Sequence, residues 1–72
     1  MDAYIRALLG DHAAKFTRRA QERLVADHRV TGHHPLVLDA SGRLRGVRLG
    51  GGRGACVSVE LFERMAKAEI VA

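Results

Sequence analysis

Residues 35–49 read PLVLDASGRLRGVRL, with two apolar stretches separated by polar residues. Asp39, Ser41 and Gly42 are typical of a tight turn, because Asp and Ser side chains cap backbone amides and Gly tolerates a positive φ. After the turn, apolar and basic side chains alternate, as expected for a strand with one buried face. The stretch therefore predicts a β-hairpin.

The second arm of this hairpin has one irregularity, at Gly46. Leu44 is out of phase with Val47 and Leu49, so a regular strand would place Leu44 on the opposite face. A glycine at such a point is typical of a β-bulge, which adds one residue and restores the phase. We therefore predict a bulge near Gly46 that turns all three apolar residues inward and places on the outer face Arg43, Arg45 and Arg48.

A third strand is predicted after a glycine-rich connection. Residues 50–54 read GGGRG, and they lack both the Lys-Ser/Thr ending of a phosphate loop and the glycine spacing of a dinucleotide fingerprint, so we expect a mobile turn. Residues 55–59 then alternate, and Cys56 is expected to be a small buried residue. Ser58 is a candidate N-cap for a last helix to about Glu69. Its expected buried stripe consists of Leu61, Phe62, Met65, Ala66 and Ile70.

The residues before the hairpin have helical periodicity. Asp2 to Leu9 predicts a short helix, and Gly10-Asp11 predicts a break after it. From His12 to about Arg29 the sequence predicts a long amphipathic helix, since apolar residues recur every three or four positions at Ala13, Phe16, Ala20 and Leu24. The expected fold is a single α+β domain over residues 1–72, in which this N-terminal helical segment and a C-terminal helix cover a three-stranded antiparallel sheet.

Composition limits the classes of protein to be considered. The chain has 72 residues, of which 47% are hydrophobic and 28% charged, and no apolar run approaches a membrane span of about 20 residues. The acidic start and the early Gly10-Asp11 do not fit a secretory signal, so a cytoplasmic location is expected. A single cysteine excludes an intrachain disulfide. The formal net charge of +4 favours nucleic acid or an acidic protein surface as partner.

The candidate binding residues are all basic. Lys15, Arg19 and Arg23 are spaced by four on the predicted long helix, where such a row either follows a phosphate backbone or forms a solvated face. On the strand, cations could equally serve solubility and discourage edge pairing. Aromatic residues are scarce, which gives little support to stacking on single strands. The full candidate set for nucleic acid or an acidic partner is Lys15, Arg18, Arg19, Arg23, Arg43, Arg45, Arg48 and Arg53.

Catalytic and metal sites find little support. His28, His33 and His34, together with Cys56, match no standard zinc spacing, and we expect the histidines to be exposed or to cap turns. No serine or cysteine nucleophile is placed beside a histidine and an orienting carboxylate. We therefore predict no metal, no cofactor and no enzymatic activity, and the role of these four residues stays open.

Residues 47–63 resemble the second half of the prevent-host-death type antitoxins. The resemblance lies in the strand Val47-Arg48-Leu49, the turn Gly52-Arg53-Gly54 and the segment ACVSVELFE at residues 55–63. In that segment an apolar strand that ends in Val-Ser leads into a short helix. It implies a dimer that binds operator DNA through basic residues of its N-terminal half. The family's toxin-neutralising tail has no counterpart before Ala72, so the resemblance does not imply toxin neutralisation.

Two functional hypotheses follow. The first is a small non-enzymatic regulator, antitoxin-like and homodimeric, that contacts the phosphates of duplex DNA through a basic helix face or a basic strand face. The second is a compact inhibitor or adaptor, of the kind carried by phages and mobile elements, that blocks a host protein complex by meeting an acidic surface. Binding to duplex DNA at low salt, or co-purification with one protein partner, would separate them.

Overall fold

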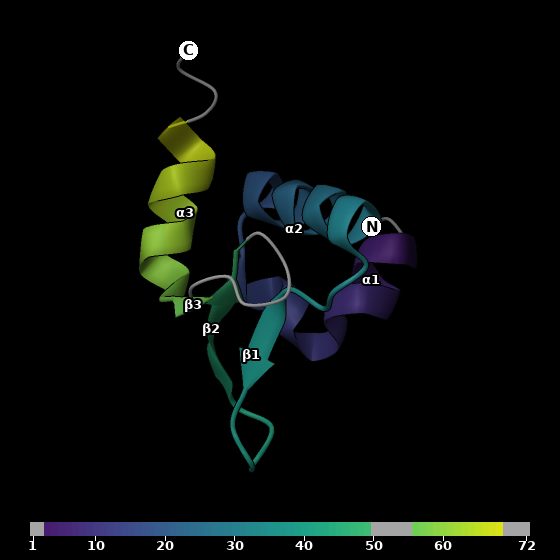
Figure 1. Ribbon diagram of the computed structural model, residues 1–72, viewed down its shortest axis with the longest axis vertical. Coiled ribbons are helices and arrows are strands. Elements are labelled where there is room, and N and C mark those ends of the chain that lie inside the picture. Colours follow the sequence, from purple (N-terminus) through teal and green to yellow (C-terminus); the bar gives the residue numbers. More distant parts are fainter. Residues whose placement is uncertain (1–2, 50–55, 69–72) are drawn as a thin grey trace.

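The computed structural model describes residues 3–49 and 56–68 (Figure 1). Along the chain the elements are α1 (Ala3–Leu9), the 3-10 helix η1 (Gly10–Lys15), α2 (Arg18–Thr31), β1 (Leu36–Leu38), β2 (Leu44–Arg48), β3 (Cys56–Val57) and α3 (Val59–Ala68). The predicted α+β class is confirmed. None of the described helices has the length and apolar character that crossing a membrane would require.

The helical segment is interrupted twice. Gly10 ends α1 with a φ of 56°, as predicted. The prediction that the long helix begins at His12 is wrong, because η1 follows α1, Phe16 is extended (φ −122°, ψ 146°) and α2 begins only at Arg18. Apolar side chains three residues apart fit a 3-10 helix, with its three residues per turn, as well as they fit an α-helix. Periodicity alone could not distinguish the two.

Polar side chains stabilise the second interruption. Thr17 is the N-cap of α2, and its Oγ1 accepts a hydrogen bond from the Ala20 N–H at 3.3 Å. The buried side chain of Gln21 donates from Nε2 to the carbonyl oxygens of Ala13 at 2.6 Å and Phe16 at 3.3 Å. The Ala13 carbonyl also accepts a hydrogen bond from the Phe16 N–H at 3.1 Å, so Gln21 adds a second bond there and gives the Phe16 carbonyl a partner. A buried carbonyl without a partner would be costly, and Gln21 thus stabilises the break.

The sheet is antiparallel, with β2 between β1 and β3. Val37 pairs with Gly46, whereas Leu38 pairs with Leu44, so Arg45 is the extra residue of β2. This register confirms the predicted bulge. The bulge restores the inward orientation of Leu44, which packs against the core.

The third strand differs from its prediction. It comprises only Cys56–Val57, because Ser58 already serves as the N-cap of α3; Ala55 lies outside the described residues, as do residues 50–54. Cys56 is exposed, which corrects the expectation that it is buried. Successive side chains of a strand point to opposite faces, and Val57 takes the face that packs against the core.

The core lies between the helices and the inner face of the sheet. Phe62 of α3 packs against Phe16 in an edge-to-face arrangement, with ring centroids 6.2 Å apart and an interplanar angle of 86°. This contact joins α3 to the helical break. The buried apolar residues are Ile5, Leu9, Ala13, Phe16, Ala20, Leu24, Val25, Leu36, Val47, Phe62 and Ala66.

Helix α3 is only partly covered. Its N-cap is Ser58, as predicted, since Ser58 Oγ accepts a hydrogen bond from the Leu61 N–H at 3.1 Å. Phe62 is buried, but the side chains of Leu61 and Met65 are 43% and 38% exposed. The expectation that these two residues are buried is therefore wrong, and the part of the predicted stripe at Ile70 lies outside the described residues.

Gly46 is required by the close approach of β3. A Cβ atom at this position would collide with the carbonyl oxygen of Val57 and lie 2.9 Å from Cys56 Sγ. We expect Gly46→Ala to lower the free energy of unfolding by about 1–3 kcal/mol, the usual cost of overpacking. Urea denaturation measures this change.

Gly32 provides the control for this prediction, because glycine is favoured there by the backbone conformation and not by a close contact. It ends α2 with a φ of 74°, and a Cβ atom there would meet nothing within 4 Å. Asn adopts left-handed backbone more readily than Ala. Gly32→Asn should therefore be less destabilising than Gly32→Ala, whereas Gly46→Asn should be at least as destabilising as Gly46→Ala. A Gly46→Ala protein as stable as the wild type would contradict the packing of β3.

Candidate functional site

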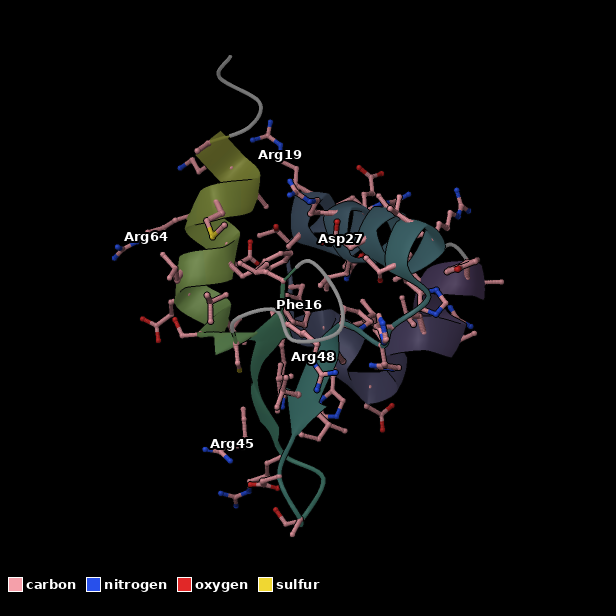
Figure 2. The ribbon with its side chains drawn as sticks, viewed as in Figure 1. Phe16, Arg19, Asp27, Arg45, Arg48 and Arg64 are labelled. Carbon is pink, nitrogen blue, oxygen red and sulfur yellow. The ribbon has the colours of Figure 1, made fainter. Side chains whose placement is uncertain are left out.

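The candidate cations do not form one continuous surface. Figure 2 shows Arg19 and Arg45 toward opposite ends of the long axis of the molecule. We call the first region the inter-helix groove, between the start of α2 and α3, and the second the hairpin surface, formed by the exposed side chains of Arg43 and Arg45. Arg53, another predicted binding residue, lies outside the described residues.

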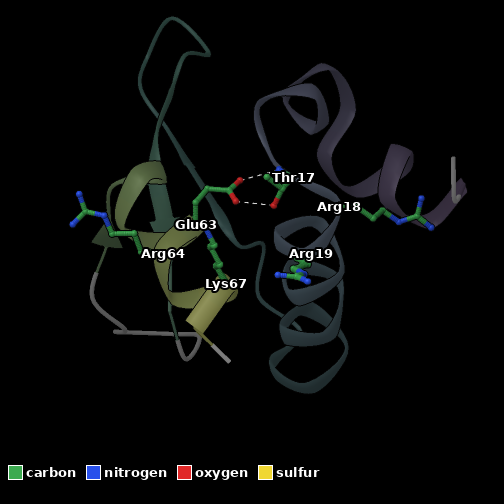
Figure 3. Close-up of a pocket in the computed structure, with 6 residues that line it drawn as sticks. All are labelled: Thr17, Arg18, Arg19, Glu63, Arg64 and Lys67. Carbon is green, nitrogen blue, oxygen red and sulfur yellow. Dashed lines mark hydrogen bonds between the residues drawn. The ribbon is translucent and has the colours of Figure 1, made fainter. Parts of the chain in front are cut away.

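The inter-helix groove has a volume of about 620 Å³. Figure 3 shows that Arg19 and Lys67 lie beside the space between the two helices, whereas Arg18 and Arg64 point away from it on opposite sides. Arg19 and Lys67 are therefore the cations closest to any ligand in the groove. The complete lining is Thr17, Arg18, Arg19, Glu63, Arg64 and Lys67.

One carboxylate joins the two walls of the groove. Glu63 Oε2 accepts a hydrogen bond from the Thr17 N–H at 2.8 Å, and Glu63 Oε1 accepts one from Thr17 Oγ1 at 2.7 Å (Figure 3). The Thr17 amide lies at the positive end of the α2 dipole, where a carboxylate is stabilised. We call this pair of bonds the Thr17–Glu63 latch. It joins α2 to α3, and both oxygens of the Glu63 carboxylate accept hydrogen bonds in it.

The cations of the helices differ in whether a carboxylate of the protein pairs with them. Ion pairs one turn apart on α2 join Arg18 to Glu22 at 3.3 Å and Arg23 to Asp27 at 3.4 Å. Such pairs add little stability, but they place a carboxylate beside the guanidinium. Among the described residues, neither Arg19 nor Lys67 forms an ion pair. These two cations are thus the better placed to meet an external anion.

The predicted basic row of the long helix is not continuous. Lys15 lies on η1, before the extended residue Phe16, whereas Arg19 and Arg23 lie on α2. The spacing of four therefore does not place Lys15 in line with the other two. A phosphate backbone could not follow all three cations along one helix.

The hairpin surface is held by a well-ordered turn. Asp39 Oδ1 accepts hydrogen bonds from Ser41 Oγ at 2.6 Å, from the Ser41 N–H at 2.9 Å and from the Arg43 N–H at 2.9 Å. The Asp39 N–H also donates to the Arg43 carbonyl oxygen at 2.9 Å. The bonds from the Ser41 hydroxyl and the Arg43 amide hold the pKa of Asp39 below its ordinary value. The backbone that carries Arg43 is therefore fixed in place.

The three strand arginines are not equally accessible. Arg43 and Arg45 are exposed, whereas Arg48 is half-buried and donates its backbone N–H to the Pro35 carbonyl oxygen at 2.7 Å. Figure 2 shows Arg45 near the end of the hairpin and Arg48 near the middle of the molecule. The hairpin surface therefore consists mainly of Arg43 and Arg45.

Two of the histidines, His28 and His34, make side-chain hydrogen bonds within the fold. His34 Nδ1 accepts from the Leu36 N–H at 3.2 Å, so its Nε2 carries the proton and donates to the Leu8 carbonyl oxygen at 3.0 Å. His28 Nδ1 lies 2.7 Å from the Tyr4 hydroxyl oxygen. Within the described ranges, no three His, Cys, Asp or Glu side chains are arranged to hold a metal ion.

Sequence reasoning missed Arg64 and Lys67. Both lie on the last helix, and both are exposed, but only Lys67 lies beside the space between the helices (Figure 3). The sequence could not reveal this position, because the approach of the two helices depends on packing between Phe16 and Phe62.

Comparisons with models of protein families, with curated proteins and with solved structures found no match to this chain.

We expect the Thr17–Glu63 latch to contribute to stability. Glu63→Ala should lower the free energy of unfolding by about 1–2 kcal/mol, because hydrogen bonds to a charged group are worth more than neutral ones. Glu60→Ala, on the same helix and exposed, is the control; it removes only a carboxylate in the first turn of α3 and should cost less than about 1 kcal/mol, and less than Glu63→Ala. A double-mutant cycle with Thr17→Ala measures the coupling through the Thr17 hydroxyl, and purely additive effects would contradict that bond of the latch.

The hairpin turn should loosen at acidic pH. The pKa of Asp39 is lowered in the folded protein, so its contribution is fully present above the pKa of the unfolded chain and is lost as the pH falls through the lowered value. Protection of the Ser41 and Arg43 amides against hydrogen exchange, measured by NMR relative to the intrinsic rate at the same pH, should therefore decrease at pH values below the ordinary range of aspartate titration. Asp39→Asn should abolish this dependence, and the same acid transition in that variant would assign it to another group.

Proposed function

We propose that the protein is a small, non-enzymatic DNA-binding regulator, similar in role to the antitoxins that residues 47–63 resemble. The observation that carries the proposal is the β1–β2 hairpin, which extends beyond the helical layer (Figure 1) and exposes Arg43 and Arg45 near its end. A protruding basic surface suits a duplex better than a narrow groove does, because the phosphates line the outside of the duplex.

The shape of the hairpin supports duplex DNA as partner. The major groove is about 12 Å wide and admits a two-stranded β-ribbon. Arginine guanidinium groups make bidentate hydrogen bonds to phosphates and to the O6 and N7 atoms of guanine. Arg43 and Arg45 can therefore act either on the backbone or on base edges once the hairpin lies against the duplex.

The rigidity of the turn also supports the proposal. Three hydrogen bonds to Asp39 Oδ1 hold the segment that carries Arg43. A binding loop that is already ordered loses less conformational entropy when it binds. The hairpin thus needs little rearrangement to present its cations.

The proposal includes a homodimer. Two copies would present two hairpins to one duplex, which increases avidity without new contacts in each copy. The exposed side chains of Leu61 and Met65 on α3 favour an apolar contact of this kind.

A salt series of binding to a generic duplex tests the proposal. Arg43→Ala/Arg45→Ala should weaken binding about tenfold at 50 mM salt and make the slope of log affinity against log salt shallower by about 2, at roughly 0.9 per lost phosphate contact. The matched control, Arg19→Ala/Lys67→Ala, removes the same charge from the opposite end and should change affinity by less than about threefold. Fluorescence anisotropy measures both.

Two outcomes would overturn the proposal. The first is the absence of binding by the wild-type protein at 50 mM salt, which would remove nucleic acid as a partner. The second is an equal loss in the two variants, since this would mean that only net charge matters. Circular dichroism of each variant checks that the fold is retained.

A further inference from the structure

We propose that the inter-helix groove binds an acidic segment of a partner protein, in which carboxylates flank at least one apolar side chain. The proposal goes beyond DNA binding, because it concerns the opposite end of the molecule and another class of partner. It stands on the shape of the groove, the charge on its walls and the carbon surface between the charges.

The shape of the groove suits side chains of a protein. Its volume of about 620 Å³ falls within the range of roughly 300–1,000 Å³ that is usual for sites enclosing a compact group. A duplex is too wide and too stiff to enter a space between two adjacent helices, whereas a helix or an extended segment can insert individual side chains. The groove therefore favours protein over duplex DNA.

The charges of the walls require an acidic ligand. Arg19 extends from α2 and Lys67 from α3, so a ligand in the groove meets one cation on each side (Figure 3). Neither forms an ion pair within the described part of the chain. Glu63 keeps its negative charge, but the Thr17 amide and hydroxyl hold its carboxylate at the latch, and the cations Arg19 and Lys67 outnumber it. Two carboxylates of a partner would each find a cation.

The surface between the cations is mostly carbon. It comes from the aliphatic stems of the long side chains and the methyl group of Thr17, since arginine and lysine cover apolar area with their stems. Burial of an apolar side chain against this surface adds about 25 cal/mol for each Å² removed from water. This requirement separates the proposed partner from a simple polyanion, which offers charge alone.

The groove is formed before any ligand binds. The Thr17–Glu63 latch joins its two walls, and the packing of Phe62 against Phe16 fixes the position of α3. A preformed site avoids the cost of ordering its walls upon association. Binding should therefore depend on Arg19 and Lys67 without a large change in the fold.

A synthetic peptide tests this inference. The probe is a labelled helical peptide in which leucines at positions i and i+4 are flanked by glutamates, and its two controls replace the glutamates by glutamine or the leucines by alanine. We expect the full-length protein to bind the probe at least about tenfold more tightly than either control peptide. Arg19→Ala/Lys67→Ala should weaken binding about tenfold, whereas Arg43→Ala/Arg45→Ala should leave it within about twofold. Fluorescence anisotropy gives each affinity.

NMR locates the binding site on the wild-type protein. Addition of the probe should shift the backbone amide signals of Thr17, Arg19 and Glu63 and leave those of Ser41 and Arg43 unchanged. The inference is overturned if the probe does not bind, if its leucine-free control binds equally well, or if the shifts appear at the hairpin. Binding of DNA is measured separately through the hairpin variants, so failure of one proposal leaves the other to be decided on its own data.

Discussion

The position of α3 depends on the break in the helical segment at Phe16 and Thr17. In a continuous α-helix, the Thr17 N–H would bond to the carbonyl oxygen of Ala13, four residues earlier. The break directs that amide to Glu63 instead, and the Ala13 carbonyl accepts hydrogen bonds from the Phe16 N–H and the Gln21 side chain. It also brings the Phe16 ring against α3. One local irregularity therefore provides both the apolar contact and the polar contact by which the last helix packs, and the inter-helix groove is the space beside them.

A second irregularity shapes the other end of the protein. The bulge at Arg45 lets β2 keep Leu44 against the core while the hairpin continues away from the helices. A bulge also increases the local twist of a strand pair. Beside it, Gly46 leaves space for β3, because any Cβ atom there would collide with Val57. Both ends of the molecule that carry exposed cations are thus set by interruptions of regular structure.

The features that were predicted correctly are those that neighbouring residues determine. Asp39 and Gly42 specify the turn, Gly46 marks the bulge, and Ser58 caps the last helix. The start of α2 was misplaced because a spacing of three residues fits two kinds of helix. The exposure of Cys56 and the groove at Lys67 depend on which elements pack together, and no local pattern contains that information. Arg19, Arg43 and Arg45 could be named as candidates from the sequence, but their placement on two separate surfaces could not.

That division has an electrostatic consequence. The molecule measures 37 Å along its longest axis, and Arg19 and Arg45 lie toward its opposite ends. At physiological ionic strength the Debye length is about 8 Å, so charges separated by most of the molecule are largely screened from each other. An anion bound at one surface therefore neither repels nor attracts a second anion at the other to an appreciable extent. The proposed DNA contact at the hairpin would therefore not compete with the proposed acidic segment in the groove.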